Sequence, residues 1–359
     1  MLYIGIDQHR KQLTVCVRNE EGDIVLRRQV STEWKRVRAF WTEIRTMAGE
    51  TSFLAILEVC GFNDWLLKML SEHGCRQVFL VQPEKQSKKK TDRRDANMLG
   101  EILWLNRQRL LDDKRVQGVR VIHLPSAADA EGRQVTQIRK RTGELCTRTI
   151  NRIRHLLRKH NLEQECPTKG LDTVKGKKWL TEVALGAMDR IEMDLLLAQW
   201  KLWKEQIAAL DAEISKRQAE NKTAAVLATI PGSRAYSSLA LATRIGEIKH
   251  FRSPGSLPNF WGITPGCRNS GEATDRLGSI TKQGSAMARF ILGQLVLHVL
   301  RRDASMRAWY SKIKRRRGSK IARVAVMRRL ATIIWHMVKN NEPYVVGGPP
   351  RKKLAKKAA

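Results

Sequence analysis

The chain has 359 residues, 42% of them hydrophobic, so it is long enough for roughly two or three domains with buried cores and is not expected to be disordered. It carries 67 Lys and Arg against 35 Asp and Glu, a formal net charge of +32. Residues 1–105 hold 17 basic and 14 acidic side chains, whereas residues 281–359 hold 20 basic and only 2 acidic ones. This excess favours a polyanionic partner, with nucleic acid as the first choice.

Secretion and membrane insertion are not expected. The N-terminus lacks a charged segment followed by an apolar one, and no apolar run approaches the roughly 18–20 residues of a membrane span. The cysteines show neither a Cys-x-x-Cys spacing nor a paired His signature, which disfavours zinc and favours reduced thiols in the cytoplasm. They are Cys16, Cys60, Cys75, Cys146, Cys166 and Cys267.

The first apolar run, residues 2–7, is predicted to be a strand that ends in a carboxylate, Asp7. An acid at a strand end can hold a metal ion. Residues 12–17 alternate apolar with polar side chains, and a turn then leads into a third strand at 24–30. Three strands in antiparallel succession with an acid on the first are the opening of a ribonuclease-H-like fold, which predicts further acids downstream.

A helix is expected from about residue 32 to 47, because apolar residues recur there at helical spacing. Residues 53–58 form a continuously apolar run that suits the centre of a sheet and again ends in an acid, Glu58. A helix at 64–72 and a strand at 77–81 follow. Strand, helix and strand in this order predict a parallel pair.

A strongly basic run, residues 85–94, leads into a helix expected to reach about residue 105. Asp92 and Asp95 are three positions apart, so on a helix they share a face. Their like charges repel unless a cation lies between them. Each acid alone could cap a strand or form a surface ion pair, so only the set of four indicates a site.

Residues 126–162 and 177–220 predict two long helices, the first very basic, which could form an antiparallel hairpin or a dimerisation arm. In the second helix we expect an apolar seam beside two tryptophans. The seam comprises Leu195, Leu202, Ile207, Leu210 and Ile214, and the tryptophans are Trp200 and Trp203.

Two shorter helices, 225–230 and 235–245, are expected on either side of a Pro-Gly turn. Residues 253–281 are rich in Gly, Pro, Ser and Thr, which indicates a structured loop region of the kind that carries active residues. Residues 285–340 return to helices, and the basic tail at 346–359 is expected to be mobile.

The predicted organisation therefore has four parts. These are an α/β domain at 1–105, a basic helical arm of coiled-coil type at 106–222, a mainly helical domain at 223–345 and the tail.

The order Asp, Glu, Asp-x-x-Asp stands here as Gly5-Ile6-Asp7, Leu57-Glu58 and Thr91-Asp92-Arg93-Arg94-Asp95-Ala96. It resembles the DEDD transposases of bacterial insertion sequences. This is the IS-one-ten family, which contains the Piv-type DNA invertases and is related at its N-terminus to RuvC Holliday-junction resolvases. Two later segments also look like those of the family: Phe251-Arg252-Ser253 with Phe260-Trp261-Gly262-Ile263-Thr264-Pro265, and Ser270-Gly271 followed by Ile280-Thr281-Lys282-Gln283-Gly284.

The resemblance implies a RuvC-like N-terminal domain in which Asp7, Glu58, Asp92 and Asp95 bind Mg²⁺, with Mn²⁺ as the other candidate. Phosphodiester chemistry develops negative charge on the attacking and leaving oxygens, and clustered carboxylates hold one or two such ions roughly 4 Å apart to neutralise it. Hard cations with oxygen ligands are favoured over zinc.

The resemblance also implies that Ser270 attacks the phosphate and forms a covalent phosphoserine, which conserves bond energy for rejoining. By itself, a Ser before Gly in a loop is usually a turn residue. Ser285 stands where the family commonly has Asn, and it supplies a second hydroxyl near by. The implied site is composite, with the acids and the serine meeting between protomers of a dimer or tetramer.

The expected function is a DNA transposase or recombinase that cuts and rejoins strands of a mobile element and its target, in the bacterial cytoplasm at the nucleoid. The resemblance implies guidance by a structured bridge RNA that pairs with donor and target. Two enzyme alternatives remain, a RuvC-like junction-resolving nuclease that needs no serine and a DNA invertase of the same family. A non-catalytic nucleic-acid-binding protein is the third.

Basic side chains in several parts of the chain are expected to contact phosphates of DNA or RNA rather than only solvate helix faces. They are Lys88, Lys89, Lys90, Arg93, Arg152, Arg154, Lys282, Arg315, Arg316, Arg317 and Arg323.

Overall fold

A computed structural model of the chain describes residues 1–83, 92–267 and 277–348, with the side chains of residues 83, 92–94, 267 and 277 outside this description. The chain divides into two compact units, Met1–Leu124 and Pro125–Ala359. No described helix is long and apolar enough to cross a membrane.

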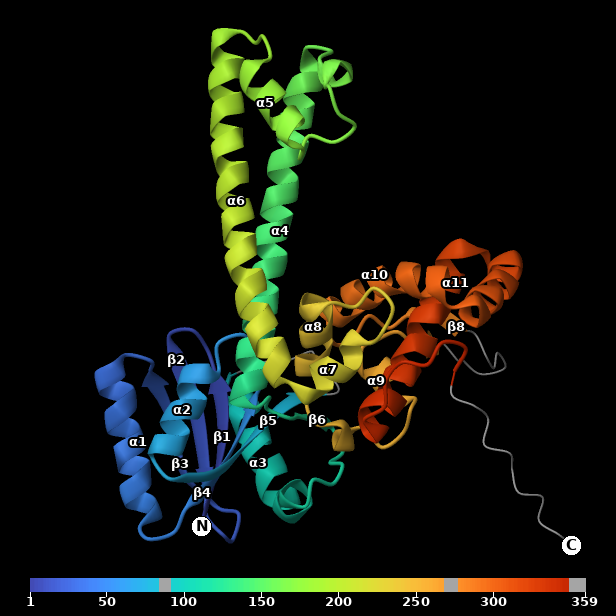
Figure 1. The fold of residues 1–359 in the computed structure, drawn as a ribbon. Coiled ribbons are helices and arrows are strands. Elements are labelled where there is room, and N and C mark those ends of the chain that lie inside the picture. The colour runs from blue at the N-terminus through green and yellow to red at the C-terminus, as the bar shows by residue number, and fades with distance from the viewer. Residues whose placement is uncertain (84–91, 268–276, 349–359) are drawn as a thin grey trace, which may run out of the picture. The chain divides into compact units, whose positions relative to one another are not determined.

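The first unit is built on a six-stranded sheet in the order β3-β2-β1-β4-β5-β6 (Figure 1). Among the first three strands, the central strand β2 runs antiparallel to both β1 and β3, β4 and β5 run parallel to β1, and β6 is antiparallel to β5. The antiparallel opening and the parallel pair are therefore confirmed. The strands are β1 (Leu2–Gln8), β2 (Gln12–Arg18), β3 (Ile24–Ser31), β4 (Phe53–Glu58), β5 (Cys75–Pro83) and β6 (Val119–Ile122).

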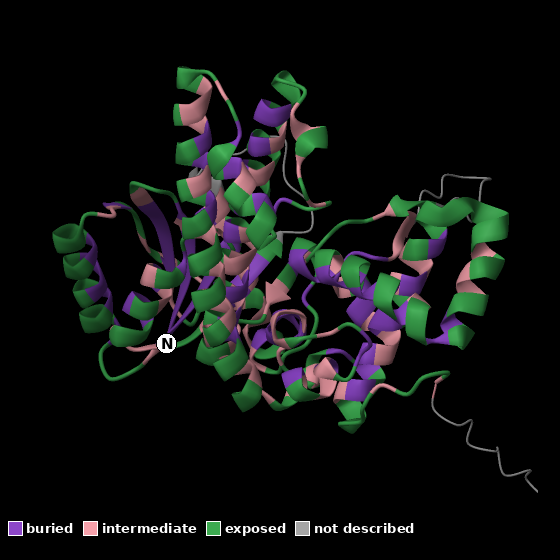
Figure 2. Cartoon of the chain, turned by 45° about the horizontal axis from the view of Figure 1, so that its top comes forward, coloured by how far each residue is buried: buried purple, intermediate pink, exposed green. Residues whose placement is uncertain are grey.

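Helices cover both faces of this sheet. On one face, Ile4 and Ile6 pack with α1 (Trp34–Ala48) and α2 (Asp64–Glu72). On the other, Tyr3 and its neighbours pack with α3 (Asp92–Leu111). Successive side chains of a strand point to opposite faces, so continuous apolar runs are required here. Figure 2 shows these strands buried while the outer sides of the helices are exposed.

The sheet continues beyond residue 105, where the sequence placed the end of the first domain. After α3 the chain returns to add β6, whose Val121 pairs with Val81 of β5. Because this strand belongs to the sheet, the first compact unit reaches Leu124. The four-residue strand was not predicted.

The second unit begins with a helical hairpin made by α4 (Ala127–Lys159) and α6 (Ala187–Glu220), with α5 (Val174–Glu182) at its tip (Figure 1). Ion pairs show that the long helices are antiparallel: Arg139 contacts Asp211 at 2.9 Å, and Lys159 contacts Asp189 at 2.8 Å. The hairpin alternative is thus confirmed.

Two details of the arm differ from the prediction. A single helix from residue 177 to 220 was wrong, because Val183 is extended after α5 and a new helix starts after Gly186. The seam was wrong in part: Leu195 and Leu202 are exposed, whereas Ile207, Leu210 and Ile214 pack as predicted. The side chains that pack towards α4 recur at spacings of three and four, and they are Met193, Leu196, Trp200, Trp203, Ile207, Leu210 and Ile214.

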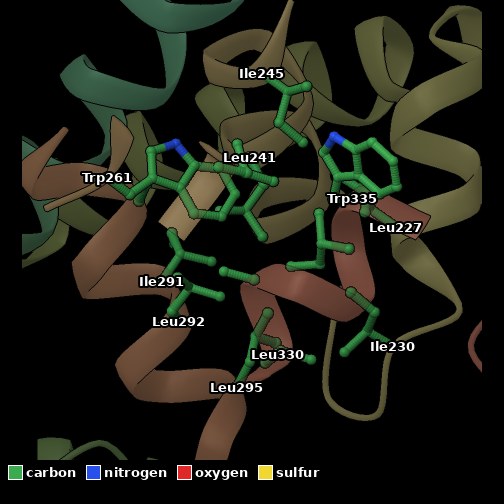
Figure 3. Packing of buried hydrophobic residues seen from close by; sticks show 14 of the residues in the cluster. Leu227, Ile230, Leu241, Ile245, Trp261, Ile291, Leu292, Leu295, Leu330 and Trp335 are labelled. Atoms are coloured by element: carbon green, nitrogen blue, oxygen red, sulfur yellow. The ribbon is translucent and has the colours of Figure 1, made fainter. Parts of the chain in front are cut away.

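The remaining part of the second unit is helical around one apolar cluster (Figure 3). Leu241, Trp261, Ile291, Leu330 and Trp335 meet there from separate segments of the chain. A short strand pair lies within the predicted loop region. The elements are α7 (Lys222–Ala228), α8 (Ala235–Ile245), α9 (Ser256–Phe260), β7 (Pro265–Cys267), β8 (Leu277–Ile280), α10 (Ala286–Arg302) and α11 (Ala304–Asn340).

Single turns of 3-10 helix occur at Glu163–Glu165 and Ile248–His250. The longest helix, α11, is interrupted at Gly318, whose backbone has φ 82° and ψ 165°. The five cysteines whose side chains are described are all free thiols, as expected.

Candidate active site

Asp7 and Glu58 lie at the same level near the carboxyl ends of the neighbouring parallel strands β1 and β4. The strand register pairs Ile6 with Leu57, and each acid is the next residue along its strand. Ile6 and Leu57 both pack towards α1 and α2, so the alternation of side chains assigns the two acids to the face covered by α3. The Asp7 side chain is only 15% exposed.

The helix that carries the other two acids crosses this strand at very short range. A Cβ atom at Gly5 would lie 2.2 Å from the Ala96 carbonyl oxygen and 2.3 Å from the Gly100 nitrogen, so only glycine allows the approach. Asp95 directly precedes Ala96 and is half-buried. The structure therefore brings the strand of Asp7 and the helical turn of Asp95 together, whereas the Asp92 carboxylate lies outside the described residues.

A buried amide network fixes the ends of β1 and β4 to each other. The Asn63 amide donates to Gln8 Oε1 at 2.8 Å and to the Glu58 carbonyl at 3.3 Å, while the Gln8 amide donates to the Phe62 carbonyl at 3.0 Å. Gln8 and Asn63 are 8% and 3% exposed. Sequence reasoning missed both positioning residues, although Gln8 directly follows the first acid.

His9 Nε2 lies 3.0 Å from Asp7 Oδ2. The imidazole is nearly half exposed, so it borders the acids without being enclosed by them. This contact orients the Asp7 carboxylate from the solvent side of the strand end.

The donor chemistry of the acids suits a hard divalent cation, because carboxylate oxygens are the ligands that Mg²⁺ and Mn²⁺ prefer. Within residues 1–83, 92–267 and 277–348, no three His, Cys, Asp or Glu side chains lie close enough to hold a metal ion. Asp7 and Glu58 supply two carboxylates at one edge, and Asp95 lies on the helix that crosses it.

Ser270 lies outside the described residues, but the segments on both sides of it are described and contact each other. Pro265 of β7 pairs with Ile280 of β8, and Lys282 donates a backbone hydrogen bond to the Gly262 carbonyl at 3.1 Å. Residues 268–276 thus connect two paired strands. The described parts of the two family-like segments, residues 260–265 and 280–284, therefore contact each other and form one structural unit.

Two residues fasten this unit to α10. Arg289 Nη1 donates to the carbonyls of Trp261, Gln283 and Gly284 at 2.9, 3.1 and 3.3 Å. Ser285 caps the helix, since its hydroxyl accepts a hydrogen bond from the Ala288 nitrogen at 3.1 Å. The second hydroxyl noted in the sequence therefore has a structural partner.

The predicted phosphate-binding side chains differ in their surroundings. Arg152 pairs with Glu192 at 2.9 Å, and Arg154 lies 3.9 Å from Glu163. The helical group Arg315, Arg316, Arg317 and Arg323 is exposed, as is Lys282, and none of them has a carboxylate partner among the described residues. Lys88, Lys89, Lys90 and the Arg93 side chain lie outside that part of the chain.

Comparison with known proteins gives two matches to transposase family models. A DEDD transposase model of the IS110 type matches residues 4–162, and the model of the transposase IS116/IS110/IS902 family matches residues 224–311. The first covers the sheet with the acids, and the second covers the unit that contains Ser270.

Curated relatives match most of the chain. The chain is 25% identical over 361 residues to the transposase for insertion sequence element IS1111A of Coxiella burnetii, covering 96% of this chain and 91% of that protein. It is 22% identical over 360 residues to a probable family 20 transposase of Pseudomonas aeruginosa, covering 96% and 98%. A putative transposase of Sinorhizobium fredii, y4pF/y4sB, is 24% identical over 80% of this chain and 73% of its own.

The acidic strand ends, the helix that crosses them and the paired strands around the serine segment all fall within the matched regions. A DEDD domain of this kind indicates the use of a divalent metal. The chain belongs to the IS110 family of DEDD transposases and is a DNA transposase or recombinase.

Proposed function

We propose that the first unit is a ribonuclease-H-like, RuvC-like catalytic domain. The support is its strand order, 3-2-1-4-5, with an antiparallel opening and a parallel continuation. The observation that carries the functional proposal is the shared level of Asp7 and Glu58, with α3 in backbone contact beside them.

In this proposal Asp7, Glu58, Asp92 and Asp95 bind Mg²⁺, for which Mn²⁺ can substitute. When bound, the ion supplies positive charge to the phosphate oxygens at which negative charge develops. The chain's own contribution is orientation: Gln8 and Asn63 hold the strand ends, and His9 holds the Asp7 carboxylate. Close positioning of this kind is worth large rate factors.

Ser270 is the proposed nucleophile. Its Oγ bonds to phosphorus while the bond from phosphorus to the leaving sugar oxygen breaks, and the serine proton is transferred overall to that oxygen. In rejoining, a sugar hydroxyl of the new strand attacks phosphorus, and its proton passes overall to the serine oxygen as the serine bond breaks. Two exchanges of this kind conserve the number of phosphodiester bonds.

The proposed partners are DNA of the element ends and target, and a structured bridge RNA. The exposed basic side chains near Gly318, which lack carboxylate partners in the described part of the chain, support a polyanion of either kind. The site of action is then the nucleoid in the bacterial cytoplasm.

We further propose a homo-oligomer in which α6 pairs with α6 of a second copy. Met188, Ile191, Leu195 and Leu202 are exposed and recur at spacings typical of a coiled-coil seam, on a face other than the one packed on α4. Asp194 and Lys201 lie seven positions apart on one side of this outer seam and carry opposite charges, which suits antiparallel self-pairing; within one copy Asp194 also pairs with Arg190 at 3.1 Å. Leu195→Glu is expected to lower the mass measured by light scattering, and Val174→Glu, at an exposed residue of α5, is the control.

The test of the chemistry is a denaturing gel for a covalent protein–DNA adduct, with Mg²⁺, an element-end duplex and the element's RNA. Wild type and Ser285→Ala should form the adduct, whereas Ser270→Ala and Asp7→Asn should not. Cleaved DNA without an adduct, unaffected by Ser270→Ala, would overturn the serine assignment and favour a junction-resolving nuclease.

A further inference from the structure

A cavity of about 460 Å³ opens on the α3 face of the sheet, next to the acids. Strand pairing sets Thr14 opposite Gln29 and Cys16 opposite Arg27, and it also sets Thr14 beside Asp7. The cavity is thus one strand away from the candidate active site. It is lined by Thr14, Val15, Cys16, Arg27, Arg28, Gln29, Ala96 and Asn97.

Positive charge at this cavity is poorly compensated. Arg18 and Arg27 both donate to the same neutral acceptor, Asn97 Oδ1, at 3.2 and 3.4 Å, and the Cys16 thiol donates to it at 3.4 Å. Burial raises the pKa of that thiol, so it stays neutral. Arg18 also has Glu101 at 4.0 Å, but Arg27 has no carboxylate partner in the described part of the chain.

A second polar residue that lines the cavity has a hydroxyl that is unpaired within the part of the chain that the structure describes. Thr14 is 4% exposed, and its hydroxyl has no hydrogen-bond partner among the described residues. Leaving a buried hydroxyl unpaired costs about 1–3 kcal/mol, so native structures seldom keep one without a ligand or water to satisfy it. A donor at Thr14 and a guanidinium at Arg27 together form a site for an anionic oxygen.

The lining residues also narrow the ligand class. Among the described lining residues none is aromatic, so they offer no ring on which a base could stack. None of these residues is acidic, so they offer no carboxylate to a cation. The Arg27 guanidinium and the Thr14 hydroxyl are groups that recognise a phosphate, and the cavity volume leaves space for the sugar attached to it.

We propose that this cavity binds a backbone phosphate of the DNA strand held at the acids, with Arg27 and Thr14 contacting its oxygens. The proposal rests on the proposed function, because it assigns the cavity to the strand that Asp7 and Glu58 act on. Two strand spacings of roughly 4.8 Å separate β3 from β1, so the phosphate belongs to a nucleotide near the cut. Arg27 and Thr14 are positioning residues for that strand.

The test replaces single phosphates of an element-end duplex by neutral methylphosphonates and measures binding by fluorescence anisotropy. Replacing the phosphate at one position near the cut should weaken wild-type binding about tenfold, which is 1.4 kcal/mol. The same replacement should not weaken binding by the Arg27→Gln variant beyond the loss caused by the variant itself. Arg36→Gln is the matched control, since Arg36 lies in α1 on the opposite face of the sheet, does not line the cavity and pairs with Glu33 at 3.2 Å. It should respond like wild type.

The Thr14→Val variant distinguishes a loss of DNA binding from a loss of folding stability. Removing an unpaired buried hydroxyl should leave the stability unchanged or raise it, while binding of the unmodified duplex falls several-fold. Equal responses of wild type and Arg27→Gln at every phosphate position would overturn the proposal. If the effects of Arg27→Gln and of one methylphosphonate are coupled but no Ser270 adduct forms, the cavity proposal holds and the serine chemistry fails. The two failures are therefore distinguishable.

Discussion

Gly5 of β1 and Ala96 of α3 meet through their backbones, and no side chain heavier than hydrogen fits between them at Gly5. Gly5→Ala should force the helix away from the strand, because a Cβ atom would stand 2.2 Å from a backbone oxygen. We expect the free energy of unfolding to fall by about 1–3 kcal/mol or more, as in other overpacked cores.

The same shift would move Asp95 relative to Asp7, so metal-dependent strand cleavage should fall further than stability does. Urea denaturation and the adduct assay measure the two effects. Gly293→Ala is the control, since Gly293 lies in α10 with open space around its Cβ position, and it should be neutral or stabilising. Full activity of Gly5→Ala would contradict the proposed role of this contact.

Leu195 and Leu196 are sequence neighbours with opposite surroundings, 61% and 2% exposed. Leu196→Ala should destabilise the second unit by about 2–5 kcal/mol, because it opens a cavity between α4 and α6. Leu195→Ala should change stability by less than about 0.5 kcal/mol. Thermal denaturation compares the two variants, and equal losses would show that the seam has been assigned to the wrong face.

Asp303 connects the start of α11 to the segment that follows the end of this helix. Its carboxylate accepts hydrogen bonds from the Met306 nitrogen, the Tyr344 hydroxyl and the Gly347 nitrogen at 2.9, 2.8 and 3.1 Å. Burial alone would raise the pKa of Asp303, but these hydrogen bonds outweigh it and lower the pKa below its ordinary value.

Because the folded-state pKa of Asp303 is lowered, its contribution to stability is present above the unfolded pKa of about 4 and is lost as the pH falls through the folded value. Asp303→Asn should cost about 1–3 kcal/mol at pH 7 and should flatten the acid limb of the stability curve. Glu182→Gln, at an exposed carboxylate, should do neither. An unchanged acid limb in Asp303→Asn would refute this assignment.

Arg289 holds three carbonyls of the two segments beside Ser270. Arg289→Met should loosen that unit and reduce the rate of adduct formation roughly tenfold to a hundredfold, because small misplacements of a nucleophile are costly. Binding of the duplex should change much less. Arg302→Met, at an exposed position of the same helix, removes equal charge and is the control.

Local sequence patterns could predict the strand ends and most helices. Asp7 and Glu58 follow continuous apolar runs, which are typical of central strands in a sheet that helices cover on both faces. The buried and exposed apolar faces of α6 were harder to tell apart from the sequence, because Leu195 and Leu196 both belong to apolar patterns with three- and four-residue spacings. Only the position of α4 distinguishes them.

The cavity next to the acids could not be predicted from local pattern. Cys16 and Asn97 are 81 positions apart, and their contact depends on the register of β2 and on the close approach at Gly5. The short β6 was missed for a similar reason, since Val119–Ile122 acquires its strand partner only through β5. Tertiary pairing determines both features.

The α4–α6 hairpin leaves and re-enters its unit at one place, where Val135, Ile214 and Leu239 of α8 pack together. Deleting the same number of whole heptads from both helices would bring the tip closer to α8 without moving either attachment point. Each heptad pair removed would shorten the arm by roughly 10 Å. The length of the arm can therefore change, by mutation or by design, without altering the α8 contacts at which the arm is attached.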